Sequence, residues 1–549
     1  MVNSFTISGG PFLTRRSYMN RCLSLLLSLT LVLGTLTGCS GGYKDGMDFV
    51  YALPQNVDTL DPQTAARQSS YLVIGSIFQG LCGIDDQGEV VPGAAKKWEA
   101  NADYTQFTFH LYKDAKWSDG RPVTADDFLF AIQRALLPET ATPSVDDLFV
   151  IQGARAVYNG DADQSYLGVW AQDEHTLVVS LERSYADFPA LTAGAHYMPC
   201  NREYFEECSG HYGLSAEYLI TNGPFTFQSI YSWSTDPGKR QIVLVPSDNY
   251  RARDKVAPAT LTYLIDYEDS LTEDPVGSLI AGKIDVTTLP ENDAELAADS
   301  GCGVQVMDDA VTGLLFNSQA GILKYPQARE IFTKLIDRQD LLDRRMDNNS
   351  EEAMGLMPNC VHWNGGSYYS DGARIYTLQD DGVLESSLPS FLSLTDNERM
   401  PNITVICPND EESVNIANGL LVSWNKKLGT AYNIEPLDDG EFQARIASGD
   451  YQAALYTLRA GGTTPYQVLK AFESSSTPML LNSTDFDSQL HSLSFGLSAY
   501  RELEEYLQEN GIFYPLFTDK TYYVTSPNSQ GISASPDLRI DFSAAKKSD

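Results

Sequence analysis

Positive charge is scarce in this chain. Its 549 residues hold 38 Lys and Arg against 73 Asp and Glu, which gives a formal net charge of −35 at pH 7. A field of that sign repels phosphate backbones, so we expect no nucleic-acid partner. It also opposes acidic ligands at long range, although a local pocket can override the net charge.

The sequence also lacks the short motifs of common hydrolases and nucleotide-binding enzymes. No His-Glu-x-x-His, no Gly-x-Ser-x-Gly and no Walker phosphate loop occurs in it. We therefore predict no catalytic residues, no cofactor and a protein that is not an enzyme. An extracytoplasmic peptidase is the alternative, which new cleavage products from a peptide library would reveal.

Long apolar runs are missing except for one near the start. Residues 22–34 are mostly apolar and follow three arginines, an order typical of an export signal, and the run is too short to span a bilayer. Directly after it, Leu36-Thr-Gly-Cys39 has the pattern of a lipoprotein cleavage site. We predict that residues 1–39 are a lipoprotein signal, that Cys39 carries the lipid, and that the mature protein is anchored at the extracytoplasmic face of the cell membrane.

Two alternatives concern the first eighteen residues. Met19 stands immediately before Asn-Arg and the apolar run, so translation can begin there instead of at Met1. Alternatively, the string Thr14-Arg-Arg-Ser-Tyr is a weak twin-arginine export signal. Either way, removal of residues 1–39 takes away three arginines and no acid, which leaves the mature part near −38.

Cysteine is sparse and scattered in the mature part, so no dense disulfide framework is expected. The first candidate for a bridge in an oxidising compartment is Cys200 with Cys208. The same two cysteines lie close in sequence to His196 and His211, the one constellation with zinc-ligand spacing. Unpaired residues of no special role are the third interpretation, and we predict no metal site.

Helix and strand patterns intermix along the chain without repeats. A period-two strand is predicted at 107–112, a further strand at 176–181, and a capped helix from Thr124 to Arg134. Further helices are predicted at 325–336, 414–428 and 500–507, and the stretch 367–397 is predicted to be an irregular surface excursion. The mixture indicates an α/β or α+β protein of more than one domain.

Several strings in this chain resemble, in the same order, the large bacterial solute-binding proteins that serve oligopeptide and dipeptide ABC importers. The most specific is 115–128, which reads Ala-Lys-Trp-Ser-Asp-Gly-Arg-Pro-Val-Thr-Ala-Asp-Asp-Phe. The others lie at 60–62, 221–227, 281–285, 315–317, 328–338 and 513–517. The resemblance therefore covers nearly the whole mature chain and is weakest between about 358 and 400.

The resemblance implies a periplasmic-binding-protein-like α/β fold of class II, with two lobes joined by a hinge. Domain I is then discontinuous and comprises 40–78, 221–311 and 512–549, while domain II spans 79–220 and domain III spans 312–511. The implied function is that of a substrate-binding lipoprotein, which captures an oligopeptide or related small solute in the cleft and delivers it to permease subunits. A ligand sensor or a binder of a non-peptide solute on the same fold is the alternative.

In this family the peptide lies as an extended strand, its main chain hydrogen-bonded to the cleft and its side chains in roomy hydrated pockets. The resemblance places two cleft segments in this chain. Their ligand-binding positions are Ala66, Arg67, Gln68 and Ser69 in the first segment, and Leu458, Arg459, Ala460 and Gly461 in the second.

Gly461 departs from the family pattern. Peptide binders of this family commonly carry an aspartate that holds the ligand's α-ammonium, and alignment on Pro465 places that position at Gly461. Because a buried ammonium without a partner is costly, this chain either holds an amine through another carboxylate or takes a ligand without a free α-amine. Arg67 and Arg459 can meet a ligand carboxylate, or they are ordinary surface arginines.

Overall fold

The computed structural model describes residues 47–548 except 144, 268–269, 346–350, 364–365, 371, 373–384, 477 and 493–495. The predicted signal, both candidate start sites and Cys39 lie outside the described residues. Residues Met47–Asp549 form one structural unit. Within the described part of the chain, no helix has the length and apolar character needed to cross a membrane.

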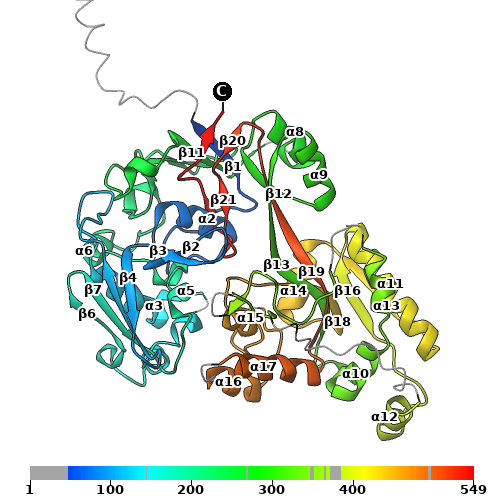
Figure 1. Ribbon diagram of the computed structural model, residues 1–549. Helices are drawn as coiled ribbons and strands as arrows, with labels where there is room; N and C mark the ends of the chain where they lie inside the picture. Colours follow the sequence, from blue (N-terminus) through cyan, green and yellow to red (C-terminus); the bar gives the residue numbers. More distant parts are fainter. Residues whose placement is uncertain are drawn as a thin grey trace, which may run out of the picture. The chain divides into compact units, whose positions relative to one another are not determined.

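A mixed sheet of eleven strands runs through this unit (Figure 1). Its order is β17 (Asn433–Leu437), β16 (Thr404–Pro408), β18 (Ala453–Arg459), β13 (Gly303–Phe316), β19 (Phe513–Thr525), β12 (Val286–Leu289), β1 (Asp48–Ala52), β11 (Thr260–Leu264), β10 (Gln241–Pro246) and β8 (Phe225–Phe227), and β9 (Trp233–Ser234) pairs with β10. Segments far apart in the sequence therefore share one sheet.

Two long antiparallel strands join the halves of this sheet. β13 has 14 residues and β19 has 13, and they pair along most of their length (Figure 1). The end of β13 toward Phe316 pairs with β18, whereas the end of β19 toward Thr525 pairs with β12. The continuous apolar run Leu314-Leu-Phe316 is fully buried, as expected for a strand with neighbours on both faces.

A separate sheet of four strands has the order β4 (Ala95–Ala100), β5 (Gln106–Leu111), β7 (Thr176–Ser180) and β6 (Val169–Asp173). Helix α3 (Ala125–Ala135) contacts β6 and β7. It begins with a capping box between Thr124 and Asp127, and Asp127 also accepts a hydrogen bond of 3.2 Å from the indole N–H of the buried Trp117. The family-like string at 115–128 is therefore a structural unit that fixes the start of α3.

A buried ion pair connects α3 to the Leu60-Asp-Pro62 string. The guanidinium of Arg134 donates to both oxygens of Asp61 at 2.6 Å, and it also donates to Oε1 of Gln63. Both Arg134 and Asp61 are about 4% exposed. Two parallel hydrogen bonds fix both the distance and the orientation of the Asp61 carboxylate relative to Arg134. The pair therefore holds the chain in place shortly before the next helix, α2 (Gln68–Ile77).

The other predicted helices are present, with shifted ends. They are α10 (Pro326–Lys334), α13 (Glu411–Leu428) and α17 (Leu497–Glu509). The prediction of an irregular stretch at 367–397 was wrong in part, since α12 (Ser387–Thr395) lies there and buries Phe391.

Shorter elements complete the described chain. The helices are α4 (Ala154–Tyr158), α5 (Phe188–Leu191), α6 (Arg202–Glu207), α7 (Ser270–Glu273), α8 (Pro275–Ile280), α9 (Glu291–Asp299), α11 (Arg338–Leu342), α14 (Asp439–Ser448), α15 (Pro465–Lys470) and α16 (Thr484–His491). The strands are β2 (Cys82–Ile84), β3 (Val90–Pro92), β14 (His362–Trp363), β15 (Gly366–Ser367), β20 (Ser529–Gln530), β21 (Ser533–Ala534), β22 (Ile540–Asp541) and β23 (Lys546–Lys547).

Candidate functional site

A cavity of about 910 Å³ lies beside the N-terminal turn of α2. Its walls come from α2, the end of β1, strand β19, the segment 267–290 that holds α7, α8 and β12, and the C-terminal segment 537–540. Five tyrosines contribute to these walls, namely Tyr51, Tyr71, Tyr267, Tyr522 and Tyr523. An aromatic and apolar lining with a few polar groups is typical of a ligand site.

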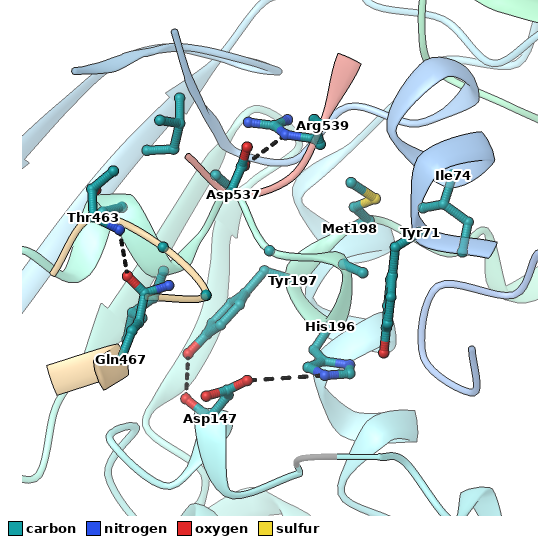
Figure 2. Close-up of a pocket in the computed structure, with 18 residues that line it drawn as sticks. Tyr71, Ile74, Asp147, His196, Tyr197, Met198, Thr463, Gln467, Asp537 and Arg539 are labelled. Atoms are coloured by element: carbon teal, nitrogen blue, oxygen red, sulfur yellow. Dashed lines mark hydrogen bonds and ion pairs between the residues drawn. The ribbon is translucent and has the colours of Figure 1, made fainter. Parts of the chain in front are cut away.

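A second cavity, of about 170 Å³, adjoins the first (Figure 2). Both are lined by Tyr71, Gly461 and Asp537, so they meet at these three residues. The small cavity extends from there toward Asp147 and His196. We treat the two together as the candidate site and refer to them as the main cavity and the small cavity.

Tyr71 is held rigidly where the cavities meet. Its hydroxyl donates a 2.6 Å hydrogen bond to the carbonyl of Ala65. Burial, with a smaller effect of Asp147 and Asp58, raises the pKa of Tyr71 to about 12, so the phenol stays neutral. The ring therefore offers an apolar face to both cavities.

The structure brings three of the eight predicted ligand-binding positions to the main cavity, namely Gln68, Arg459 and Gly461. Two others, Ala66 and Arg67, are exposed, whereas Ser69, Leu458 and Ala460 are buried and do not line either cavity. The two predicted segments thus meet at one site, but through only some of their side chains.

Arg459 already has partners in the protein. Its Nη1 lies 3.3 Å from Oδ2 of the buried Asp309 and donates to Oγ1 of Thr521 at 2.9 Å. Burial raises the pKa of Asp309 and the charge of Arg459 opposes that rise. With 55% of its side chain exposed, Arg459 keeps further N–H groups available to a ligand. The predicted partner Arg67 donates to the carbonyl of Asn56 at 3.4 Å instead.

Gly461 has a backbone conformation that few residues adopt. Its φ is +63°, and no atom lies within 4 Å of the position a Cβ would occupy. Its backbone N–H and C=O have no hydrogen bond to another described residue. Main-chain donor and acceptor groups are therefore open at the point where the two cavities meet.

Contacts beside the small cavity, which Asp147 lines, hold the segment 464–491 against the segment 146–185. The hydroxyl of Tyr185 donates to Oγ1 of Thr464 at 3.1 Å, and Nη1 of Arg183 donates to the carbonyl of Leu490 at 2.6 Å. Nζ of Lys470 lies 2.8 Å from Oδ2 of Asp146 and 2.5 Å from Oδ1 of Asp147. These bonds tie the two segments together next to Asp147.

The predicted bridge between Cys200 and Cys208 is wrong, because both are free and buried. Burial raises the pKa of Cys200 to about 12, so it is an inert thiol. The described residues contain no group of three metal-ligating side chains. Of the two histidines near these cysteines in the sequence, His196 lines the small cavity. The ring centroid of His211 lies 5.1 Å from the ring centroid of Tyr218.

Sequence reasoning missed four residues that shape the site, namely Tyr71, Asp147, Tyr522 and Asp537, and it singled out His196 only as a possible zinc ligand. Tyr71 lies one turn after Gln68 on α2, and helical spacing from a predicted position is the signal that would have found it. Asp147 and Asp537 carry no local signal, because only the tertiary fold brings them to Gly461.

Comparisons with known proteins agree on the fold. The sequence model of one family, described as "Bacterial extracellular solute-binding proteins, family 5 Middle", matches residues 89–479. Listeria monocytogenes OppA bound to peptide superposes with a TM-score of 0.72 at 20% identity, over 92% of this chain and 99% of that chain. The predicted class II periplasmic-binding-protein-like fold is therefore confirmed.

Relatives of similar length extend the likeness beyond that middle region. The oligopeptide-binding protein OppA of Bacillus subtilis (strain 168) is 27% identical over 467 residues, which cover 82% of this chain and 83% of its own. The periplasmic murein peptide-binding protein MppA of Escherichia coli (strain K12) is 26% identical over 423 residues, which are 75% of each chain. This chain belongs to the bacterial extracellular solute-binding proteins of family 5.

Proposed function

We propose that this protein captures a short peptide in the main and small cavities and delivers it to the permease of an ABC importer. The observation that carries the proposal is the main cavity of about 910 Å³, which opens onto Gly461, whose main chain has no hydrogen bond to another residue that the structure describes. Support comes from the relatives OppA and MppA, whose names record peptide binding.

A peptide suits this site for a physical reason. An extended peptide presents one N–H and one C=O per residue, and such groups pair with open main-chain groups on a receptor. Gly461 offers one such pair, and Arg459 offers guanidinium N–H groups in the same cavity. Aromatic walls tolerate varied side chains, so we expect recognition of the peptide main chain with loose side-chain selection.

We further propose that the chain is organised as the resemblance implies, with domain I formed by 40–78, 221–311 and 512–549, domain II by 79–220 and domain III by 312–511. On that division, the contacts of Lys470, Tyr185 and Arg183 join domain II to domain III. They support a closed state in which the ligand is enclosed, and opening about the hinge would release it.

The proposed location is the extracytoplasmic face of the cell membrane, with a lipid on Cys39. The lipoprotein pattern Leu36-Thr-Gly-Cys39 supports the anchor, and the periplasmic location in the name of MppA supports export. An anchored receptor stays within reach of a membrane permease, which is a functional reason for the lipid.

Thermal unfolding of the purified protein with pools of short peptides tests the binding function. A ligand at about 100 times its Kd stabilises the folded state by about 2.7 kcal/mol, which is a measurable rise in Tm. Pools of sugars of similar size serve as the control. If no peptide pool raises the Tm while a different solute does, peptide capture is wrong.

A non-peptide solute is the second candidate, because one wall of the main cavity is apolar. Leu271, Ile284 and Leu289 line that wall, next to Tyr267. Mass spectrometry of small molecules that co-purify with the protein separates the candidates.

A role as a ligand sensor instead of an import receptor is tested by deleting the gene. A sensor would bind peptide as a purified protein, yet cells that lack the gene would take up peptide normally.

A further inference from the structure

Negative charge exceeds positive charge at one end of the small cavity. The single ammonium of Lys470 is shared by two carboxylates, with Nζ 2.5 Å from Oδ1 of Asp147 and 2.8 Å from Oδ2 of Asp146. One ammonium cannot neutralise both carboxylates, so this end of the cavity attracts a further cation.

Neighbouring charged groups do not remove this excess. Glu473 approaches Lys470 but has its own partners, Nε2 of His491 at 2.6 Å and Nη2 of Arg155 at 3.8 Å. At the other end of the cavity, Asp537 and Arg539 pair with each other at 2.6 Å. The surplus carboxylate charge therefore stays at the pair Asp146 and Asp147, of which Asp147 lines the cavity.

Of the two carboxylates, Asp147 is the one that a ligand can reach. It lines the small cavity and its side chain is 28% exposed, whereas that of Asp146 is 7% exposed. Its Oδ1 is taken by Lys470, and its Oδ2 lies 4.0 Å from Nε2 of His196, too far for a hydrogen bond.

Nδ1 of His196 is a second polar atom without a hydrogen-bond partner in the part of the chain that the structure describes. The residue is only 7% exposed and lines the small cavity. Burial lowers the pKa of His196, so the imidazole is neutral and one ring nitrogen accepts a hydrogen bond. The ring nitrogen Nε2 lies 4.0 Å from Oδ2 of Asp147, so a donor placed between these two atoms would reach both.

The chemistry of these groups selects the ligand. A ligand carboxylate would face the charge of Asp147, and a hydroxyl would leave that charge unbalanced. A primary ammonium has three N–H donors and a positive charge, so it can donate both to Oδ2 of Asp147 and to the imidazole of His196. The rings of Tyr71 and Tyr197 lie beside these two residues (Figure 2), and aromatic faces favour a cation.

We propose that the small cavity is the subsite for a primary ammonium group of the ligand, with Asp147 as its anchor and His196 as a second acceptor. This inference rests on the proposed function and makes Asp147 the carboxylate that compensates for Gly461. The ammonium is either the α-ammonium of a peptide or that of a lysine side chain, and both present the same donors.

Native mass spectrometry with three pools of short peptides tests this subsite. The first pool has free amino termini and no lysine, the second is N-acetylated and contains lysine, and the third is N-acetylated without lysine. We expect the unaltered protein to prefer one of the first two pools over the third by about 30-fold or more, and Asp147→Asn to abolish that preference. Whichever pool is preferred identifies the source of the ammonium.

Asp146→Asn is the matched control, because it changes the other partner of Lys470 but does not line the cavity. It is expected to lower binding of all pools alike and to keep the preference. If Asp147→Asn lowers all pools equally, or if the unaltered protein binds the third pool as well as the others, the ammonium subsite is wrong although peptide capture stands. Binding of no pool at all overturns the proposed function itself.

Discussion

Nζ of Lys470 lies 2.5 Å from Oδ1 of Asp147, although the two residues are 323 positions apart in the sequence. Lys470 ends helix α15, which follows the cleft segment 458–461, and Asp147 follows α3 on the other side of the small cavity. The pair is thus a tertiary crosslink, and its Asp147 is part of the wall of the candidate site.

Replacing Lys470 by methionine is expected to destabilise the protein by about 3–5 kcal/mol, because Asp146 and Asp147 would be left without a counter-ion. The side chain of Lys470 is only 11% exposed, so water cannot take over its role. Denaturant unfolding measures the loss. Lys97→Met is the control, since Lys97 pairs with Glu99 on the surface and its loss should leave stability almost unchanged. Equal effects of the two substitutions would contradict the importance of the buried pair.

Glu504 on α17 is expected to make stability depend on pH. It is fully buried and accepts hydrogen bonds from the backbone N–H of Leu356 and the hydroxyl of Tyr369. Burial raises its pKa from 4.5 to about 7, against the opposing effect of these hydrogen bonds. The folded state therefore holds this proton more tightly than the unfolded state does.

Because the pKa is higher in the folded state, the contribution of Glu504 is most favourable below pH 4.5. It falls by about 3 kcal/mol as the pH rises to 7, and it is constant above that. Glu504→Gln, which cannot ionise, should remove this part of the pH dependence. The measurement is the difference in unfolding free energy between the two proteins across that range. A difference that does not change with pH would show that the carboxyl keeps an ordinary pKa.

Gly461→Asp is expected to raise the affinity for peptides with a free amino terminus by about tenfold, because it adds a carboxylate where the two cavities meet. The position has room for a side chain, and Asp and Asn are among the residues that tolerate its φ of +63°. Gly461→Asn has the same shape without the charge and measures the backbone cost alone. Calorimetric titration with free and N-acetylated peptides gives the comparison, and the account fails if Asp and Asn behave alike.

Cys39→Ser is expected to release the protein from membranes, because the proposed lipid is attached at that sulfur. Cell fractionation followed by immunoblotting measures the distribution, and the mass of the N-terminal peptide reports the lipid directly. Cys22→Ser, within the predicted signal, should leave the mature protein anchored. Retention of the Cys39→Ser protein in the membrane fraction would mean that something else holds it there.

Local structure was predictable wherever the sequence pattern reports burial. The period-two strand 107–112 is β5, and the capped helix after Thr124 is α3, because side-chain periodicity depends only on neighbouring residues. The irregular stretch 367–397 was predicted less well. Its helix α12 is short and buries a single large side chain, Phe391, which is too little to set a clear period.

The site was predictable only in part. Resemblance located Gln68, Arg459 and Gly461, but not Tyr71, Asp147 or Asp537. Alignment transfers positions that the family shares, whereas a cavity is lined by whatever side chains the fold brings to it. The expected pairing of Cys200 and Cys208 failed for a related reason, since closeness in sequence does not bring two sulfurs into bonding distance.

The sequence by itself determined the charge balance, the predicted export signal, the order of helices and strands and the family. These follow from composition and from short-range patterns that each segment carries alone. Only the tertiary structure decided that Lys470 meets Asp147, that Gly461 opens onto two cavities and that Nδ1 of His196 has no hydrogen bond to any residue the structure describes. Such contacts join segments hundreds of residues apart, and their geometry is fixed by the packing of the whole sheet, not by any one stretch of the chain.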